Sequence, residues 1–255
     1  MRGATAVRTV GAPLALGVLA LALWQLAVVA FDVKPFVIPS PLAIGTAFGT
    51  TPGTILRSAL ITGANALIGL VAGAVVAILF AIVAALVKIV DQITAPLVAG
   101  LAVVPIVALA PVFYTMFGAN AQTARQLIAA IAVFIPVFLN TLRGLRQVRP
   151  VHRDLMRAYA ASPWQATRTV TLPGALPYVF TGFRIASSLA VISALVAEYF
   201  GGPIDGIGRA ITTAVSSSNY ALAWAYVVGS ILLGLAFYCV SLGLEILANR
   251  HRRPA

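Results

Sequence analysis

Residues 55–87 set the fold class. They read ILRSALITGANALIGLVAGAVVAILFAIVAALV and contain one charged side chain, Arg57. A helix needs about 20 mostly apolar residues to cross the hydrocarbon core of a bilayer, and this run is longer than that. Gly69 and Gly73 form a G-x-x-x-G step, which lets a second helix approach closely. We therefore predict a membrane-spanning helix that tilts or projects beyond the bilayer.

The rest of the chain has the same character, with 61% hydrophobic and 9% charged residues among its 255. Soluble domains carry roughly 25% charged residues, so this composition excludes a water-soluble fold. The length allows about five to seven spans with short connections and no sizeable soluble domain. We expect an all-α integral membrane protein with a single domain over residues 1–255.

Five other apolar runs complete a prediction of six spans: about 10–30, 93–117, 126–142, 178–200 and 221–248. The run 93–117 contains prolines that each free a backbone carbonyl and bend a helix: Pro96, Pro105 and Pro111. Lipid cannot satisfy freed carbonyls, so we expect this span to face protein or a polar pathway. Before the second span, Ser40 and Pro41 predict the N-cap and first residue of a short interfacial helix.

The basic residues predict the orientation, because Lys and Arg near helix ends are retained in the cytoplasm. Six spans place both termini on one side of the membrane. With the N-terminus inside, thirteen of the seventeen Lys and Arg residues are cytoplasmic: Arg2, Arg8, Lys88, Arg143, Arg146, Arg149, Arg153, Arg157, Arg168, Arg184, Arg250, Arg252 and Arg253. The other four are outside: Lys34, Arg57, Arg125 and Arg209. This bias explains the net charge of +11 better than nucleic-acid binding, because no aromatic residues alternate with the basic ones.

The one long cytoplasmic connection, residues 143–177, has ordered local chemistry. Residues 154–161 predict a short helix with Asp154 near its N-terminal end, where the helix dipole favours an acid. Ser162 and Gln165 predict a capping box that starts a second short helix. Two prolines are expected to end that helix before the fifth span: Pro173 and Pro177.

Apolar side chains on this connection are predicted to be exposed: Leu155, Met156, Tyr159 and Trp164. A pair of short helices without a core of its own is typical of a surface that binds a protein partner. The alternative is that these side chains rest in the headgroup region of the lipid bilayer. The periodicity of the segment favours neither interpretation.

The segment resembles the cytoplasmic motif E-A-A-x3-G-x9-I-x-L-P of binding-protein-dependent ABC importer permeases. Asp154-Leu155-Met156 stands in place of the triplet, Ala160 in place of the glycine, and Val170-Thr171-Leu172-Pro173 at the end, with the same spacing. The triplet and the glycine differ from the motif. Other stretches resemble the taurine, sulfonate, nitrate and thiamine-precursor branch of this family: 38–41, 161–165, 172–177 and 197–202.

The resemblance implies a type I ABC importer permease fold with six transmembrane helices and a cytoplasmic coupling helix between spans four and five. It implies a permease homodimer in the bacterial inner membrane, an extracytoplasmic solute-binding protein and a dimer of cytoplasmic ATPase subunits that bind ATP and Mg²⁺. Its ATPase-docking residues would be Asp154, Leu155, Met156, Tyr159, Ala160, Ser162, Trp164, Val170, Leu172 and Pro173. Residues 154–156 and 197–202 resemble the vitamin-precursor members most, with sulfonate, taurine or nitrate as the alternative solute class.

Four polar residues within the predicted spans are candidates for the translocation path or its gate: Glu198, Ser187, Ser188 and Asn140. An acid inside an apolar run is costly enough to indicate a function. Pairing with a basic group at the outer surface is the equally open alternative for Glu198. Helix–helix hydrogen bonding is the alternative for the other three.

Several activities lack a visible signature in the sequence. No G-x-x-x-x-G-K-[ST] phosphate loop occurs, which excludes ATP hydrolysis by that route. The sequence has no H-E-x-x-H motif and no cysteine cluster, so we expect no catalytic residue, metal site or cofactor in this chain. The single cysteine, Cys239, is expected to be buried. A secondary transporter or channel is the alternative class, although we find no internal repeat or intramembrane relay.

Overall fold

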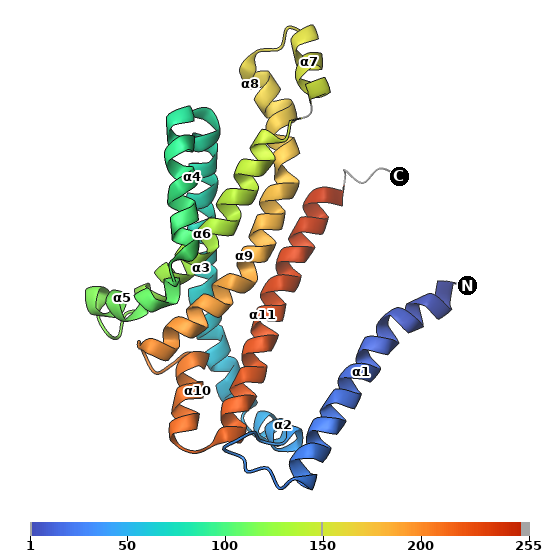
Figure 1. Cartoon of the computed structure of the whole chain (residues 1–255), viewed down its shortest axis with the longest axis vertical. Coiled ribbons are helices and arrows are strands. Elements are labelled where there is room, and N and C mark those ends of the chain that lie inside the picture. The colour runs from blue at the N-terminus through green and yellow to red at the C-terminus, as the bar shows by residue number, and fades with distance from the viewer. Residues whose placement is uncertain (1, 149, 251–255) are drawn as a thin grey trace.

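The computed structural model of the chain describes residues 2–148 and 150–250 and, within them, only helices and connecting turns. The long helices are α1 (Arg2–Ala30), α3 (Pro52–Leu86), α6 (Thr123–Arg146), α9 (Leu172–Phe200) and α11 (Tyr220–Asn249) (Figure 1). The shorter ones are α2 (Pro41–Thr50), α4 (Lys88–Val103), α5 (Ala110–Phe117), α7 (Pro150–Ala158), α8 (Pro163–Ala166) and α10 (Ile207–Ser216). A 3-10 turn, Ile106–Leu109, precedes α5, and a π-helical turn, Thr167–Thr171, joins α8 to α9.

Within the described residues, five helical segments are long and apolar enough to cross a membrane: α1 from Gly11, α3, α6, the continuous helix Pro163–Phe200, and α11. The prediction of an all-helical chain with several membrane-spanning segments is confirmed. α3, with 35 residues, extends over about 52 Å at 1.5 Å per residue, which exceeds the hydrocarbon core as predicted.

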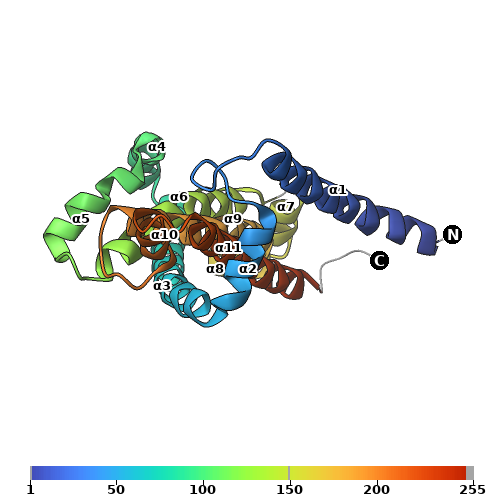
Figure 2. The ribbon, with the colours of Figure 1, turned by 90° about the horizontal axis from the view of Figure 1, so that it is seen from below.

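The third predicted span, residues 93–117, is not a continuous helix. α4 ends at Val103, and Val104 has extended backbone with φ −67° and ψ 125°. Pro105 explains the break, because proline has no N–H and disfavours a helical conformation of the residue before it. Figures 1 and 2 show α4 beside α3 and α5 projecting from the bundle on the side opposite α1.

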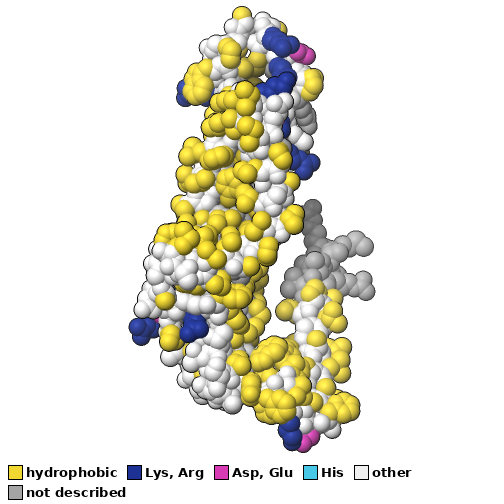
Figure 3. All heavy atoms as spheres, turned by 60° about the vertical axis from the view of Figure 1, so that its left-hand side comes forward, with side chains coloured by type: hydrophobic (Ala, Val, Ile, Leu, Met, Phe, Trp, Pro, Cys, Tyr) yellow, Lys and Arg dark blue, Asp and Glu magenta, His cyan; other side chains and the backbone are white. Residues whose placement is uncertain are grey.

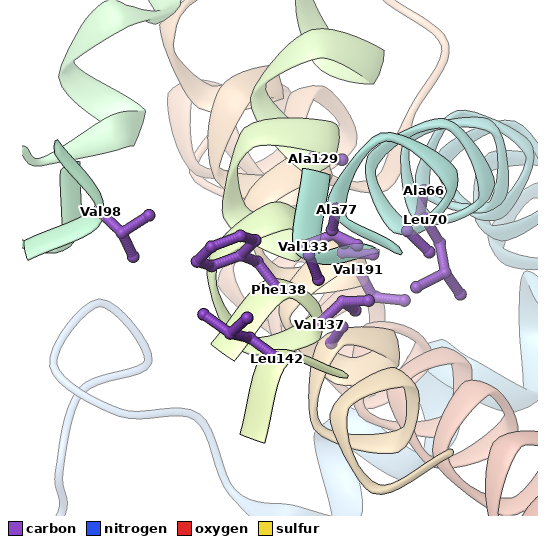
Figure 4. Close-up of a cluster of buried hydrophobic side chains, with 14 of the residues drawn as sticks. Ala66, Leu70, Ala77, Val98, Ala129, Val133, Val137, Phe138, Leu142 and Val191 are labelled. Atoms are coloured by element: carbon purple, nitrogen blue, oxygen red, sulfur yellow. The ribbon is translucent and has the colours of Figure 1, made fainter. Parts of the chain in front are cut away.

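The packed core lies between α3, α6 and α9, and the α3 face of it consists mainly of small residues. A Cβ atom on Gly69 would lie 2.5 Å from the Cβ of Ala129, and one on Gly73 would lie 2.4 Å from the carbonyl oxygen of Ala130. The predicted G-x-x-x-G step therefore brings α3 against the backbone of α6. Figure 4 shows side chains from α3, α4, α6 and α9 meeting in this core.

α1 lies apart from this core. None of the residues in its apolar window is buried, and it diverges from the bundle in Figures 1 and 2. Its contacts are near its C-terminal end, where the rings of Trp24 and Trp224 meet edge to face at 5.7 Å. α1 therefore offers most of its apolar surface to lipid or to another chain.

Two local predictions have opposite outcomes. Ser40 caps α2, because its Oγ accepts a hydrogen bond from the Ala43 N–H at 3.2 Å, and Pro41 is the first helical residue as predicted. Cys239 is exposed, so the prediction that it is buried is wrong. The reason is that α11 packs against the bundle along one side only, and Tyr238 and Val240 are exposed with it.

The short helices between the long ones lie mainly toward two ends of the molecule (Figure 1). α7, α8 and the C-terminal end of α11 lie at one end, and α2 and α10 lie at the other (Figure 1). Figure 3 shows basic side chains toward both ends and a broad hydrophobic surface between them. Arg149, Arg252 and Arg253 lie outside the described residues, as do the side chains of Arg2 and Arg8.

Candidate functional site

The predicted docking segment is a pair of short helices, α7 and α8, at one end of the molecule (Figure 1). α7 begins at Pro150, earlier than predicted, because proline suits the first position of a helix. Asp154 therefore lies in the middle of α7, and the prediction that it stabilises the N-terminal end of the helix is wrong. Its carboxylate lies 3.6 Å from the Arg157 guanidinium instead, on an exposed face.

The turn between α7 and α8 has one unusual residue. Ala160 has φ 48°, in the left-handed region that favours glycine, and it stands where the importer motif has glycine. Beyond it the predicted capping box is confirmed. Ser162 Oγ accepts from the Gln165 N–H at 3.3 Å, and Gln165 Oε1 accepts from the Ser162 N–H at 2.7 Å.

The helix that starts after Ser162 does not end at the two prolines, so that prediction is wrong. It runs without interruption from Pro163 to Phe200. In the π-helical turn the N–H of Leu172 donates to the carbonyl of Thr167, five residues back. This wider turn changes the hydrogen-bond register immediately before Pro173, which then occupies the first turn of α9. The second half of the docking segment, α8, and the fifth predicted span therefore form one continuous element.

Most apolar side chains of the segment are exposed. Leu155 is 50% exposed, Tyr159 76% and Trp164 66%, and Leu172 is also exposed. Met156, Val170 and Pro173 are half-buried, whereas Ala160 and Ser162 are exposed. Hydrophobic and basic side chains lie together at this end of the molecule (Figure 3). Such a surface fits a partner that covers the apolar side chains and faces the basic ones.

Glu198 lies near the other end of the same continuous helix, and its side chain is fully buried. Its Oε1 and Oε2 atoms lie 2.9 and 3.1 Å from Thr62 Oγ1, which donates to the carboxylate, and Oε2 accepts from the Gly208 N–H at 2.7 Å. Arg125 Nη1 lies 3.4 Å from Oε1. The structure thus contains the alternative anticipated for Glu198, an ion pair with a basic group, in the protein interior.

Arg125, one of the four basic residues predicted on the outer side of the membrane, has a fully buried side chain. Its Nη1 donates to Asp205 Oδ1 at 2.8 Å and to Gln122 Oε1 at 2.9 Å, and its Nη2 donates to the carbonyl of Pro203. A signal was present in the sequence, because Arg125 lies four residues before Ala129, on the face of α6 that packs against α3.

Further hydrogen bonds extend this arrangement across four parts of the chain. Gln122 Nε2 donates to Asp205 Oδ2 at 2.8 Å, Asn65 Nδ2 donates to Gln122 Oε1 at 2.7 Å, and Gln126 Nε2 donates to Asn65 Oδ1 at 2.9 Å. We call the connected set the Glu198 cluster: Thr62, Asn65, Gln122, Arg125, Gln126, Glu198 and Asp205. It joins α3, α6, α9 and the connection that leads to α10.

The other path candidates do not gather with Glu198. Ser187 is buried and its Oγ donates to the carbonyl of Arg184 at 2.7 Å. Asn140 Nδ2 donates to the carbonyl of Pro136 at 2.8 Å. Ser188 lines a largely apolar groove of about 560 Å³ between α9 and α11. Their place along a translocation path stays a prediction.

Arg184 is paired within the chain, as is Arg125. Its Nε lies 3.1 Å from Glu245 Oε2 on α11, and its guanidinium lies 5.9 Å from the centre of the Tyr238 ring. Both side chains of the ion pair keep partial exposure, in contrast to Arg125 and Glu198. The pair ties α9 to α11 toward the α7–α8 end.

The chain is similar in sequence to a described family and to several known proteins. Residues 73–253 match the family described as binding-protein-dependent transport system inner membrane component. Over 242 residues the chain is 31% identical to the riboflavin transport system permease protein RibX of Chloroflexus aurantiacus, covering 94% of this chain and 89% of the relative. It is 32% identical over 189 residues to the putative aliphatic sulfonates transport permease protein SsuC of Escherichia coli, covering 73% and 72%.

Two further similarities complete the comparison. The chain is 29% identical over 184 residues to the formylaminopyrimidine transport permease protein ThiX of Halalkalibacterium halodurans, covering 69% of this chain and 70% of the relative. A crystal structure of an amino acid ABC transporter with histidines has a TM-score of 0.65 at 15% identity, covering 77% of this chain and 94% of the other. At that identity the likeness concerns the fold alone.

Proposed function

Because the chain belongs to the family of binding-protein-dependent transport system inner membrane components, we propose that it forms the translocation path of an ABC importer whose ATP hydrolysis takes place in separate subunits. The observation that carries this proposal is the α7–α8 segment, which exposes Leu155, Tyr159 and Trp164 at one end of the molecule. These side chains fill a groove on a cytoplasmic ATPase dimer, which holds ATP and Mg²⁺.

The coupling role follows from continuity as well as exposure. α8 runs through the π-helical turn into α9 without a break, so a displacement of α8 is transmitted along a helix of 38 residues. A flexible loop would lose such a displacement. The segment thus combines an apolar docking surface with a rigid link to the membrane interior.

We propose that two copies of the chain assemble around the path. The broken third region supports this assembly, because the break between α4 and α5 leaves the apolar side chains of Val103 and Val104 exposed. Pro105 and Pro111 have no N–H to continue the helix, and irregular backbone within a bilayer needs protein or water as partners. A second copy that packs against this region supplies those partners, with α9 close to the shared path.

The orientation belongs to the same proposal. Both termini and residues 143–177 face the cytoplasm, as the excess of basic residues at that end favours. The opposite end, where α2 and α10 lie, then faces the solute-binding protein. Within the membrane, Ser187, Ser188 and Asn140 are the polar residues proposed to lie along or near the path.

For the solute we propose a heterocyclic vitamin or vitamin precursor. The relatives named for riboflavin and formylaminopyrimidine transport support this class, and the riboflavin relative matches 94% of the chain. A sulfonate is the alternative, supported by a relative of similar identity over 73% of the chain. Binding of riboflavin, an aminopyrimidine and taurine to the purified solute-binding protein distinguishes the two classes.

Reconstitution in liposomes tests the proposed function. The chain is purified together with an ATPase subunit and a solute-binding protein of an ABC importer from the same genome. Solute uptake is then measured with ATP on the side of the liposome membrane that α7 and α8 face. We expect uptake only with all three proteins and ATP. Proton- or sodium-driven uptake by the chain alone would instead identify a secondary transporter.

A further inference from the structure

The N-terminal end of α10 is capped by residues from other helices. The N-cap of α10 is Gly206, which has no side chain to accept the free N–H groups of the first turn. The N–H of Ile207 donates to Thr62 Oγ1 on α3 at 2.9 Å, and the N–H of Gly208 donates to Glu198 Oε2 on α9 at 2.7 Å. The Thr62 hydroxyl in turn donates a hydrogen bond to Glu198, so one carboxylate and one hydroxyl cap the N-terminal end of α10.

The backbone of α10 fits this carboxylate closely. A Cβ atom on Gly206 would lie 2.2 Å from Glu198 Oε1, and one on Gly208 would lie 2.3 Å from the carbonyl oxygen of Leu195. Both distances are shorter than any van der Waals contact, so only glycine lets α10 approach α9 in this way. The carboxylate is therefore held between the start of α10 and the guanidinium of Arg125.

The cluster also reaches the surface on one side. The side chain of Asp205, which pairs with Arg125, is 31% exposed. Asp205 and Gly206 line a polar groove of about 600 Å³ whose wall also contains Arg57 and Thr213. Asp205 thus links this groove to the buried Glu198 through two ion pairs that share Arg125.

From this geometry we propose that Glu198 and Arg125 are positioning residues for transport: they clamp α10 against α3 and α9 at the end opposite the docking segment and do not contact the solute. Both oxygens of Glu198 are engaged by donors within the chain, and its side chain is fully buried. Glu198 and Trp164 lie on the same helix of 38 residues, about 57 Å long. The role in transport rests on the proposed function, whereas the clamp itself is a property of the chain alone.

A cysteine reporter on α10 tests the clamp. Ile211 is buried on α10, and Ile211→Cys in a Cys239→Ser background is labelled by a water-soluble maleimide in membrane vesicles only when α10 separates from its neighbours. Adding Glu198→Gln is expected to raise the labelling rate roughly ten- to a hundredfold, the range that a hydrogen bond to a charged group contributes to an equilibrium constant. The matched control is Glu245→Gln, which alters the Arg184–Glu245 ion pair near the middle of α9 and should leave the rate unchanged.

A milder pair of variants keeps the test informative if Glu198→Gln does not accumulate in the membrane. Thr62→Val keeps the shape of the side chain and removes the hydroxyl that bonds Ile207 and Glu198. We expect about a tenfold faster labelling for Thr62→Val, as for the loss of one net hydrogen bond. Thr62→Ser, which retains the hydroxyl, should be labelled at the same rate as the parent.

The transport assay distinguishes a positioning role from a solute contact. Glu198→Gln should lower the maximal uptake rate and raise the ATP hydrolysed per solute, with the KM for solute unchanged. Unchanged labelling in both Glu198→Gln and Thr62→Val, or equal acceleration by Glu245→Gln, would overturn the clamp. A changed KM with unchanged labelling would assign Glu198 to the solute path. Labelling needs neither ATP nor solute, so an inactive parent would count against the proposed function and leave the clamp test intact.

Discussion

The two ends of the helix Pro163–Phe200 differ in how their unusual side chains are accommodated. Near one end, the charged Glu198 is fully buried and both of its oxygens have partners within the chain. At the other, the aromatic Trp164 is exposed, and the neighbouring turn exposes Tyr159. At one end the polar groups are paired within a single chain, whereas at the other the apolar side chains are exposed and the proposed ATPase would cover them. Substitutions at the two ends should therefore change different measurements.

The largest effect is expected at the buried end. Arg125→Ala leaves Glu198 buried without its counter-ion, which costs about 3–5 kcal/mol when one member of a buried pair is removed. The variant should unfold at a clearly lower temperature in detergent, with no partner present. The control is Arg184→Ala, whose ion pair is partly exposed and should cost much less. Parent-like unfolding of Arg125→Ala would mean that the Glu198 cluster contributes little to stability.

The exposed end should show the reverse pattern. Trp164→Ala removes a large apolar anchor and should weaken association with the ATPase by about 2 kcal/mol or more if Trp164 is an interface hot spot. Thermal unfolding of the chain alone should not change, because Trp164 packs against little within it. Titration of the purified ATPase measures the association. Trp224→Ala, at the end near α2, is the matched control, and an equal loss there would argue against a specific docking role.

A smaller effect is expected from the cap between the two short helices. Ser162→Ala removes the acceptor for the Gln165 N–H and should weaken ATPase association by about 1 kcal/mol, since a lost N-cap typically costs that much. Ser162→Asp keeps an acceptor at the same position and should retain most of the affinity. A loss as large as that of Trp164→Ala would indicate that Ser162 contacts the partner directly.

The smallest change should have the opposite sign. Ala160→Gly removes the strain of a left-handed backbone at φ 48°, which should stabilise the turn by about 1–2 kcal/mol. The greater conformational freedom of glycine in the unfolded chain offsets part of this, so the net stabilisation of the turn is about 0.5 kcal/mol. We expect slightly tighter ATPase association in the same titration. Ala161→Gly, one residue later and outside the left-handed region, should weaken association instead. Weaker binding of Ala160→Gly would show that its methyl group belongs to the interface.

Local features of this protein could be predicted from neighbouring residues in the sequence. Apolar runs of sufficient length predicted the membrane-spanning helices, and the caps at Ser40 and Ser162 followed from residues within three positions of each. The close approach of another helix to α3 could also be predicted, because two glycines four residues apart lie on the same helix face. The structure identifies that helix as α6. These signals depend on short-range geometry, which the order of residues specifies directly.

Burial and pairing depend on distant residues and could not be predicted in the same way. Thr62 and Glu198 are 136 positions apart, and Arg125 and Asp205 are 80 apart, so a count of charges near span ends predicted the side of the membrane for Arg125 but neither its burial nor its partners. Pro173 marked a helix end by its local chemistry, yet the π-helical turn before it carries the helix through. In each case the outcome depends on which groups the packed helices bring within hydrogen-bonding distance, because a buried polar group is stable only where such partners exist.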